Sequence, residues 1–134
     1  MEDRVLEVLK RAKTVAVVGL SEDVSRPSFE VSSYLQNRGY RVVPINPLAG
    51  EILGEKSYPS LSEAAKIETI DIVDVFRRAE AVPAIVDEVL ELGLPVLWLQ
   101  ETVVHEEAAE KARRGGVMVV MDKCILKEHR RYGL

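Results

Sequence analysis

Five short runs of apolar, largely β-branched residues recur along the chain, and segments with helical periodicity separate them. Each run is apolar on both faces, which is typical of buried strands in a parallel sheet. Tight turns cannot join parallel neighbours, so the intervening helices must act as right-handed crossovers. This rhythm predicts an α/β fold with strands over 14–20, 41–46, 70–76, 96–100 and 117–121.

Helical patterns fill most of the remaining chain, and local signals mark some of their ends. Pro27 suits a first helical turn, and Gly39 and Gly93 each follow the last residue of a helical pattern. Ser60 and Glu63 match a capping box. We expect helices over 2–12, 27–39, 80–92 and 104–114, a short one from 60 to about 66, and a short polar one within 122–134.

These elements predict a Rossmann-like, doubly wound parallel sheet with helices on both faces. A weak sixth strand near 57–58 suits the edge of the sheet, which gives the strand order 3-2-1-4-5-6; a flavodoxin-like order also fits the pattern. A chain of 134 residues with 47% hydrophobic residues has the size of one compact domain, here 1–134.

Charge and cysteine content argue against several classes of function. The net charge of −4, with 22 acidic against 18 basic residues and no basic run, argues against a nucleic-acid or anionic-membrane partner. One cysteine and two histidines are too few for a protein-built metal site. The apolar runs are too short for a membrane span or a signal peptide, so we expect a cytoplasmic protein.

Polar residues follow the predicted strands at the edge where an open parallel sheet binds its ligands. Ser21, Arg26 and Ser28 surround the start of a helix, where free N–H groups and the helix dipole favour an anion. Arg77 and Arg78 are expected on the same side, which suits a phosphorylated small molecule. The residues that follow the five strands are Gly19–Ser21, Asn46–Pro47, Phe76–Arg78, Gln100–Glu101 and Asp122–Cys124.

Each of these residues taken alone also fits a structural role. Gly19 suits the turn after a strand, and Arg26 with its neighbours suits a helix start. Arg77 and Arg78 suit solvated surface charge. A binding role gains weight because independent segments converge on one edge of the sheet.

The loop after the first strand argues against two common nucleotide ligands. A dinucleotide site has the pattern G-x-G-x-x-G and an acidic residue at the end of the second strand. Here the loop 19–25 has one glycine, and the second strand ends in Asn46 and Pro47, so NAD fits poorly. The Walker pattern of ATPases is absent as well.

Several short segments, in this order and spacing, carry a family resemblance. The chain resembles the CoA-binding domain family of Rossmann-like proteins, the small stand-alone kind related to the nucleotide-binding domain of the succinyl-CoA synthetase α subunit. Such proteins usually have glycine two residues after Gln100, where this chain has Thr102. The matching segments are 17–21, 26–28, 34–47, 51–54, 58–61, 70–78, 98–100, 119–124 and 128–131.

The resemblance implies coenzyme A as the cofactor and assigns roles to particular residues. It places the adenosine end against Asn46 and Pro47 and the mouth of the site at Val75, Phe76 and Arg77. The 3′-phosphate of CoA carries about −1.5 to −2 charge, so it needs an arginine partner. Gln100, at the end of the 96–100 strand, belongs to the same predicted set. The pyrophosphate cradle comprises Gly19, Leu20, Ser21, Arg26, Pro27 and Ser28.

The sequence offers little for catalysis. No serine, histidine and acid have the spacing of a known hydrolase motif, so no catalytic residue is predicted. His105 is expected to begin a helix, and His129 fits either a solvated tail or a phosphate contact. Cys124 fits a small buried apolar residue, or a thiol contact that forms a mixed disulfide with CoA beside the charge of Lys123.

Together these features predict a protein that binds CoA or acyl-CoA as a non-catalytic carrier, sensor or regulatory module. Two other functions fit the same fold: a subunit of a CoA-dependent ligase, and an NAD(P)-binding protein of oxidoreductase type. A homodimer is a further expectation for a small Rossmann-like unit.

Overall fold

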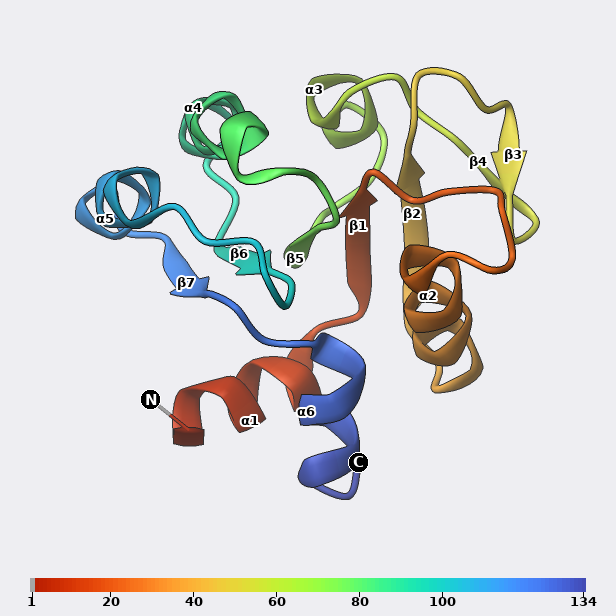
Figure 1. The fold of residues 1–134 in the computed structure, drawn as a ribbon, viewed down its shortest axis with the longest axis horizontal. Helices are drawn as coiled ribbons and strands as arrows, with labels where there is room; N and C mark the ends of the chain where they lie inside the picture. Colours follow the sequence, from red (N-terminus) through yellow and green to blue (C-terminus); the bar gives the residue numbers. More distant parts are fainter. Residues whose placement is uncertain (1) are drawn as a thin grey trace.

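A five-stranded parallel sheet crosses the middle of the molecule, which the computed structural model describes over residues 2–134 (Figure 1). The strands lie in the order β2-β1-β5-β6-β7, and every neighbouring pair is parallel. The predicted α/β class is therefore confirmed. The strands are β1 (Thr14–Val18), β2 (Arg41–Ile45), β5 (Ile72–Val75), β6 (Val96–Leu99) and β7 (Met118–Val120).

The six-stranded order is not confirmed, because the sheet has five strands. Counted along the chain, their order is 2-1-3-4-5, the flavodoxin-like arrangement that also fitted the sequence. The expected edge strand near 57–58 is reduced to a single parallel bridge between Ile45 and Tyr58. Pro59 follows directly and has no N–H to donate, so the pairing stops after one residue.

Helices cover both faces of the sheet (Figure 1). One face carries α1 (Glu2–Arg11), α2 (Pro27–Asn37) and α6 (Ile125–Arg131). The other carries α3 (Leu61–Ala65), α4 (Val82–Leu92) and α5 (Glu106–Arg114), and the 3-10 turn η1 (Ala79–Ala81) leads into α4. In the part of the chain that the structure describes, no helix is both long and apolar enough to span a membrane.

Alternate strand residues supply the two hydrophobic cores. In β1, Val15 and Val17 pack with α1, α2 and α6, whereas Ala16 and Val18 pack with α3, α4 and α5. All four side chains are buried. Full burial of a valine side chain stabilises the folded state by about 1.5–3 kcal/mol. The two cores explain why the strands are apolar on both faces.

A short hairpin that the sequence did not predict lies beside β2. Strands β3 (Glu51–Ile52) and β4 (Glu55–Lys56) pair antiparallel around Leu53 and Gly54. Both turn residues have positive φ, +56° for Leu53 and +76° for Gly54. Such a turn favours Asn-Gly or Gly-Gly, and Leu-Gly carries no comparable signal.

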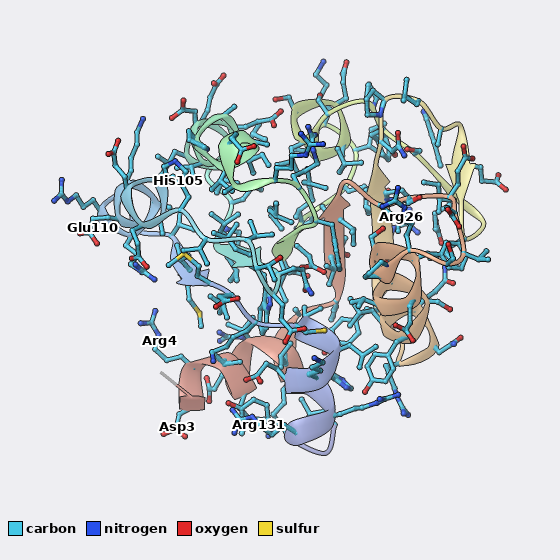
Figure 2. The ribbon with its side chains drawn as sticks, viewed as in Figure 1. Asp3, Arg4, Arg26, His105, Glu110 and Arg131 are labelled. Atoms are coloured by element: carbon cyan, nitrogen blue, oxygen red, sulfur yellow. The ribbon has the colours of Figure 1, made fainter. Side chains whose placement is uncertain are left out.

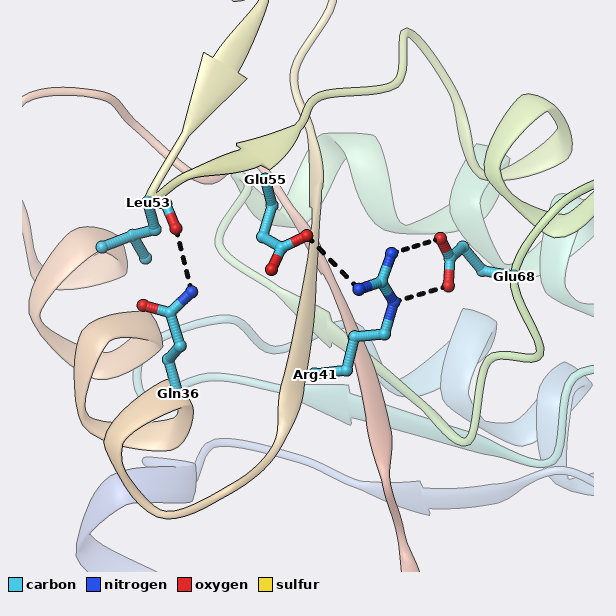
Figure 3. Close-up of polar contacts among 5 residues, drawn as sticks. All are labelled: Gln36, Arg41, Leu53, Glu55 and Glu68. Atoms are coloured by element: carbon cyan, nitrogen blue, oxygen red, sulfur yellow. Dashed lines mark hydrogen bonds and ion pairs between the residues drawn. The ribbon is translucent and has the colours of Figure 1, made fainter.

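Side chains from α2 and β2 hold this hairpin in place (Figure 3). Gln36 Nε2 donates to the carbonyl of Leu53 at 2.9 Å. Arg41 donates to both carboxylate oxygens of Glu68 at 2.7 and 2.6 Å, and its Nη1 donates to Glu55 at 3.4 Å. The hydrogen bonds from Arg41 lower the pKa of Glu68, so this carboxylate stays charged at neutral pH.

The last helix is more buried than its polar composition suggests. Ile125, Leu126 and His129 of α6 are buried, and the His129 ring is 3% exposed. The hydroxyl of Tyr34 and Nδ1 of His129 form a hydrogen bond of 2.8 Å. Burial, and next the charge of Arg38, lower the pKa of His129. The expectation of a solvated His129 is wrong, because the apolar residues beside it draw α6 onto α2.

Candidate functional site

A groove of about 1090 Å³ opens where β1, β5 and β6 end. The strand order reverses between β1 and β5, because the chain continues from β1 to β2 on one side and reaches β5 on the other. Open α/β sheets bind ligands at this point. The groove is lined by the 19–31 region (Gly19, Ser21, Arg26, Pro27, Ser28, Glu30, Val31), by 76–80 and 100–103, and by Cys124 and Lys127.

Gly19 allows the ends of β1 and β5 to approach each other closely. Its φ is +88°, a conformation that side-chain-bearing residues rarely adopt. A Cβ at this position would lie 2.4 Å from the carbonyl oxygen of Phe76 and 2.8 Å from Cδ of Arg77. Gly19 is therefore required for this backbone contact, and it does more than turn the chain.

The loop after β1 leads directly to the first turn of α2, where Ser28 holds it. The Oγ of Ser28 accepts a hydrogen bond from the backbone N–H of Ser21 at 3.0 Å. Asp23 accepts from the N–H and the hydroxyl of Ser25 at 2.9 and 2.7 Å, and these bonds lower the pKa of Asp23. The positive end of α2 is thus held open toward the groove, in an arrangement that favours an anion.

Cationic side chains reach the groove from three separate segments. Arg26 precedes α2, Arg77 and Arg78 follow β5, and Lys127 lies on α6; Figure 2 shows Arg26 on the α2 side of the sheet. The Nζ of Lys127 binds both oxygens of Glu101 at 3.0 and 3.1 Å. Across residues 3–134, no side chain forms a hydrogen bond or ion pair with the three arginines. Their guanidinium groups are available to a ligand.

Most of the residues predicted from the sequence meet in this groove. Two of the exceptions, Leu20 and Val75, are 0% exposed and belong to the hydrophobic cores. Asn46 and Pro47 lie outside the lining as well. The predicted residues that do line it are Gly19, Ser21, Arg26, Pro27, Ser28, Phe76, Arg77, Gln100 and Cys124.

Asn46 supports the loop from behind. Its Nδ2 donates to the carbonyl of Leu20 at 2.9 Å, and its Oδ1 accepts from the N–H of Leu48 at 2.9 Å. Both ends of the amide are therefore engaged by the protein. Asn46 therefore has a supporting role in the structure, and the contact of Asn46 and Pro47 with a ligand stays a prediction.

Thr102 and Lys127 are among the lining residues that were not predicted to bind. Thr102 has a φ of +73°, and Asp122, which faces it across the wall, has a φ of +60°. The Thr102 N–H donates to Oδ1 of Asp122 at 2.7 Å. For a β-branched residue this conformation is an outlier. The missing glycine after Gln100 was the only sequence signal for it.

Hydrogen bonds between two loops hold this strained wall together. Oε1 of Gln100 accepts from the N–H of Ile125 at 3.2 Å, and Nε1 of Trp98 donates to the carbonyl of Lys123 at 2.8 Å. Cys124 lies between these bonds as the residue before α6, and it is 9% exposed while lining the groove. Its position is compatible with both predicted roles, the small buried residue and the thiol contact.

Other chemistry is sparse around the groove. Among residues 3–134, no three His, Cys, Asp or Glu side chains gather as a metal-binding group. His105 caps α5, where Nδ1 accepts from the N–H of Ala108 at 3.1 Å, so the predicted helix-start role of His105 is confirmed.

A parallel sheet with a ligand groove at its order reversal defines a Rossmann-like binding domain. The chain belongs to the CoA binding domain family, whose sequence model matches residues 13–130. The family resemblance predicted from the sequence is therefore confirmed.

Known proteins with similar sequences fall into two groups. The uncharacterized protein YneT of Bacillus subtilis is 45% identical over 123 residues, which are 92% of this chain and 90% of YneT. Acetate–CoA ligase [ADP-forming] II of Archaeoglobus fulgidus is 32% identical over 102 residues, 75% of this chain. The match spans 15% of that ligase's own length.

Solved structures share the fold. A hypothetical protein from Pyrococcus horikoshii OT3 superposes with a TM-score of 0.92 at 34% identity, covering 98% of this chain and 91% of the other. The dinucleotide forming acetyl-coenzyme A synthetase 1 of Ca. Korarchaeum cryptofilum, in its apo form, gives a TM-score of 0.74 at 25% identity. That match covers 87% of this chain and 28% of the synthetase chain.

Replacing Gly19 by alanine is expected to destabilise the protein by about 2–4 kcal/mol, because strain at positive φ adds to the clash with Phe76. Urea unfolding measures this loss. Gly39→Ala is the matched control, since Gly39 has a φ of +94° and open space around its Cβ position. Its loss should be about 1 kcal/mol. Equal losses in the two variants would contradict the close contact at Gly19.

Thr102→Gly is expected to raise the free energy of unfolding by about 0.5–1 kcal/mol, because relief of strain exceeds the added flexibility of the unfolded chain. Thr69→Gly is the control, since Thr69 is an exposed loop residue without a positive φ. There we expect a loss of about 0.4–1 kcal/mol. A loss of stability in both variants would show that Thr102 stores no strain.

Proposed function

We propose that this protein binds coenzyme A or an acyl-CoA in the groove and acts as a carrier, sensor or regulatory module without a reaction of its own. The observation that carries this proposal is the convergence of the α2 start and three unpaired arginines at the reversal of strand order. Membership of the CoA binding domain family supports the same ligand.

The pyrophosphate of the ligand is best placed at the start of α2. Ser21, Ser28 and Arg26 lie there with backbone N–H groups of the first helical turn, which is a favourable environment for a doubly charged anion. Gly19 leaves the backbone open to close approach. Pro27 and the buried Leu20 shape this loop without contributing charge.

The remaining groups divide between the two ends of the ligand. Arg77 is a partner for the 3′-phosphate, and Phe76 offers an apolar surface beside it. Gln100 and Cys124 lie at the wall toward α6, where the thiol arm would end.

The other two functions receive less support. A ligase would need the rest of a much longer protein, of which this chain matches 15% in one acetate–CoA ligase and 19% in another. NAD would need an acidic residue after β2, where Asn46 stands with both amide ends engaged. The cytoplasmic location and the homodimer stay predictions from the sequence.

Calorimetric titration with CoA, dephospho-CoA and NAD tests the ligand and the role of Arg77. Arg77→Ala should weaken the binding of CoA about 10- to 100-fold, which corresponds to the loss of a charge-assisted hydrogen bond. The affinity for dephospho-CoA should stay almost unchanged. Ser21→Ala should weaken both ligands alike. Arg113→Ala, on the exposed side of α5, is the control and should change neither. If NAD binds and CoA does not, the proposed function is overturned.

Treatment with the disulfide form of CoA tests the thiol contact. The Cys124 thiolate would attack one sulfur, the S–S bond of the reagent would break, and one CoA thiolate would leave. Intact mass should rise by one CoA in the wild type, return to its starting value with dithiothreitol, and stay unchanged in Cys124→Ser. No adduct on the wild-type protein would leave Cys124 as a buried apolar residue alone.

A further inference from the structure

Asp74 is a carboxylic acid at the centre of the sheet. It lies on β5, the middle strand of five, where it pairs with Val17 on one side and Trp98 on the other. It is 0% exposed, and both neighbours belong to the core that α1, α2 and α6 cover. The strand alternation therefore directs the Asp74 side chain toward this helical layer.

Neither carboxyl oxygen of Asp74 has a hydrogen-bond partner in the protein. An isolated charge in such a place is far too costly, so the group takes up a proton instead. Burial raises the pKa of Asp74 well above its usual value, and no neighbouring charge contributes to the shift. Asp74 is thus a neutral, buried acid whose polar atoms still need partners.

Ser32, on helix α2, is a second buried polar side chain without a hydrogen-bond partner. It is 0% exposed, and the atom without a partner is its Oγ. Across residues 3–134, the buried side-chain polar atoms without partners are this Oγ and the two oxygens of Asp74. Ser32 lies on one of the helices that cover the face of the sheet toward which Asp74 points.

These two residues lie one layer below the floor of the groove. Two residues along each strand from Val17, Asp74 and Trp98 come Gly19, Phe76 and Gln100, and all three line the groove. One helical turn before Ser32 comes Ser28, which lines it as well. Asp74 is two strand residues from Phe76, and Ser32 is four helix residues from Ser28. Both spacings keep side chains on the same face, so Asp74 and Ser32 lie at a similar depth below the groove.

We propose that Asp74 and Ser32 form an internal hydration site, in which a neutral carboxyl and a hydroxyl share a buried water molecule beneath the groove. The water accepts from the carboxyl O–H and donates to the Ser32 oxygen, which gives one Asp74 oxygen and the Ser32 hydroxyl a partner that no protein atom supplies. Asp74 then acts as a positioning residue for the floor formed by Gly19 and Gln100.

This site makes binding dependent on the charge of Asp74, a consequence that rests on the proposed function. Loss of the proton would place a negative charge directly under the region assigned to the pyrophosphate. The titratable groups in the same core are Cys124, just before α6, and Tyr34, Tyr40 and Tyr132, with His129 packed against Tyr34. None of them is a lysine or an arginine, so this core supplies no fixed positive charge to compensate Asp74.

Carbon-13 NMR of the carboxyl groups in the ligand-free chain tests the protonation of Asp74, with Asp74→Asn giving the assignment. We expect the Asp74 signal to stay in its protonated position at pH 7. A titration near pH 3.8, the ordinary value for aspartate, would overturn the proposal.

The pH dependence of unfolding gives an independent reading on the same proteins. The folded state retains a proton that the unfolded state has lost, so the wild type should lose stability as pH rises. Relative to Asp74→Asn, its unfolding constant should rise up to tenfold per pH unit between pH 5 and the folded-state pKa. The control Asp71→Asn alters a carboxylate that accepts from Lys13 and Thr14 N–H groups, and it should show no such trend.

A double-mutant cycle tests the shared water. Ser32→Ala and Asp74→Asn should be non-additive in stability, because each removes a partner of the same molecule. Additive effects would overturn the shared site.

Titration of CoA across the pH range in which the Asp74 NMR signal changes completes the test, with Asp74→Asn correcting for ionisation of the ligand. The wild type should lose affinity more steeply than the variant as pH rises. Parallel profiles would overturn the positioning role. Absence of CoA binding at every pH, with the NMR result as expected, would instead contradict the proposed function alone.

Discussion

The close contact between Gly19 and the backbone of Phe76 is the constraint on which the site depends. It lies between the ends of β1 and β5, where the strand order reverses. The loops that follow these two strands therefore meet over it. Because no side chain stands between them, the start of α2 and the arginines after β5 reach the same groove. A bulkier residue at position 19 would separate these two halves before any ligand was involved.

Side-chain bonds to distant backbone groups hold the loops around this contact. Ser28 binds the Ser21 N–H, and Asn46 binds the Leu20 carbonyl, so the first loop is fixed from the helix and from β2. On the other wall, Asp122 binds the N–H of Thr102. Strained backbone persists only where its surroundings determine it in this way. The groove is therefore largely preformed in the ligand-free protein.

The sequence predicts the parts of this structure that follow from local periodicity and from the carboxyl-end rule. The runs around Val17 and Val73 predict central strands because both faces are apolar, and the strand ends then place Ser21 and Arg77 at one edge. The hydrogen-bond partner of the buried His129 is Tyr34, which is 95 residues away in the chain, so this pairing leaves no local signal. The positive φ of Leu53 and of Thr102 likewise accompanies a hydrogen bond to a distant residue, Gln36 and Asp122 respectively.

The difference between Arg41 and Arg77 shows what only the structure can add. Arg41 begins a strand and Arg77 follows one, but the sequence does not show which of the two has a carboxylate partner. Arg41 binds both oxygens of Glu68, so its charge is already used to fix the edge of the sheet. Arg77 has no carboxylate partner among the described residues and lies over the strand reversal. An anion that enters beside an unpaired arginine gains attraction without first breaking an ion pair.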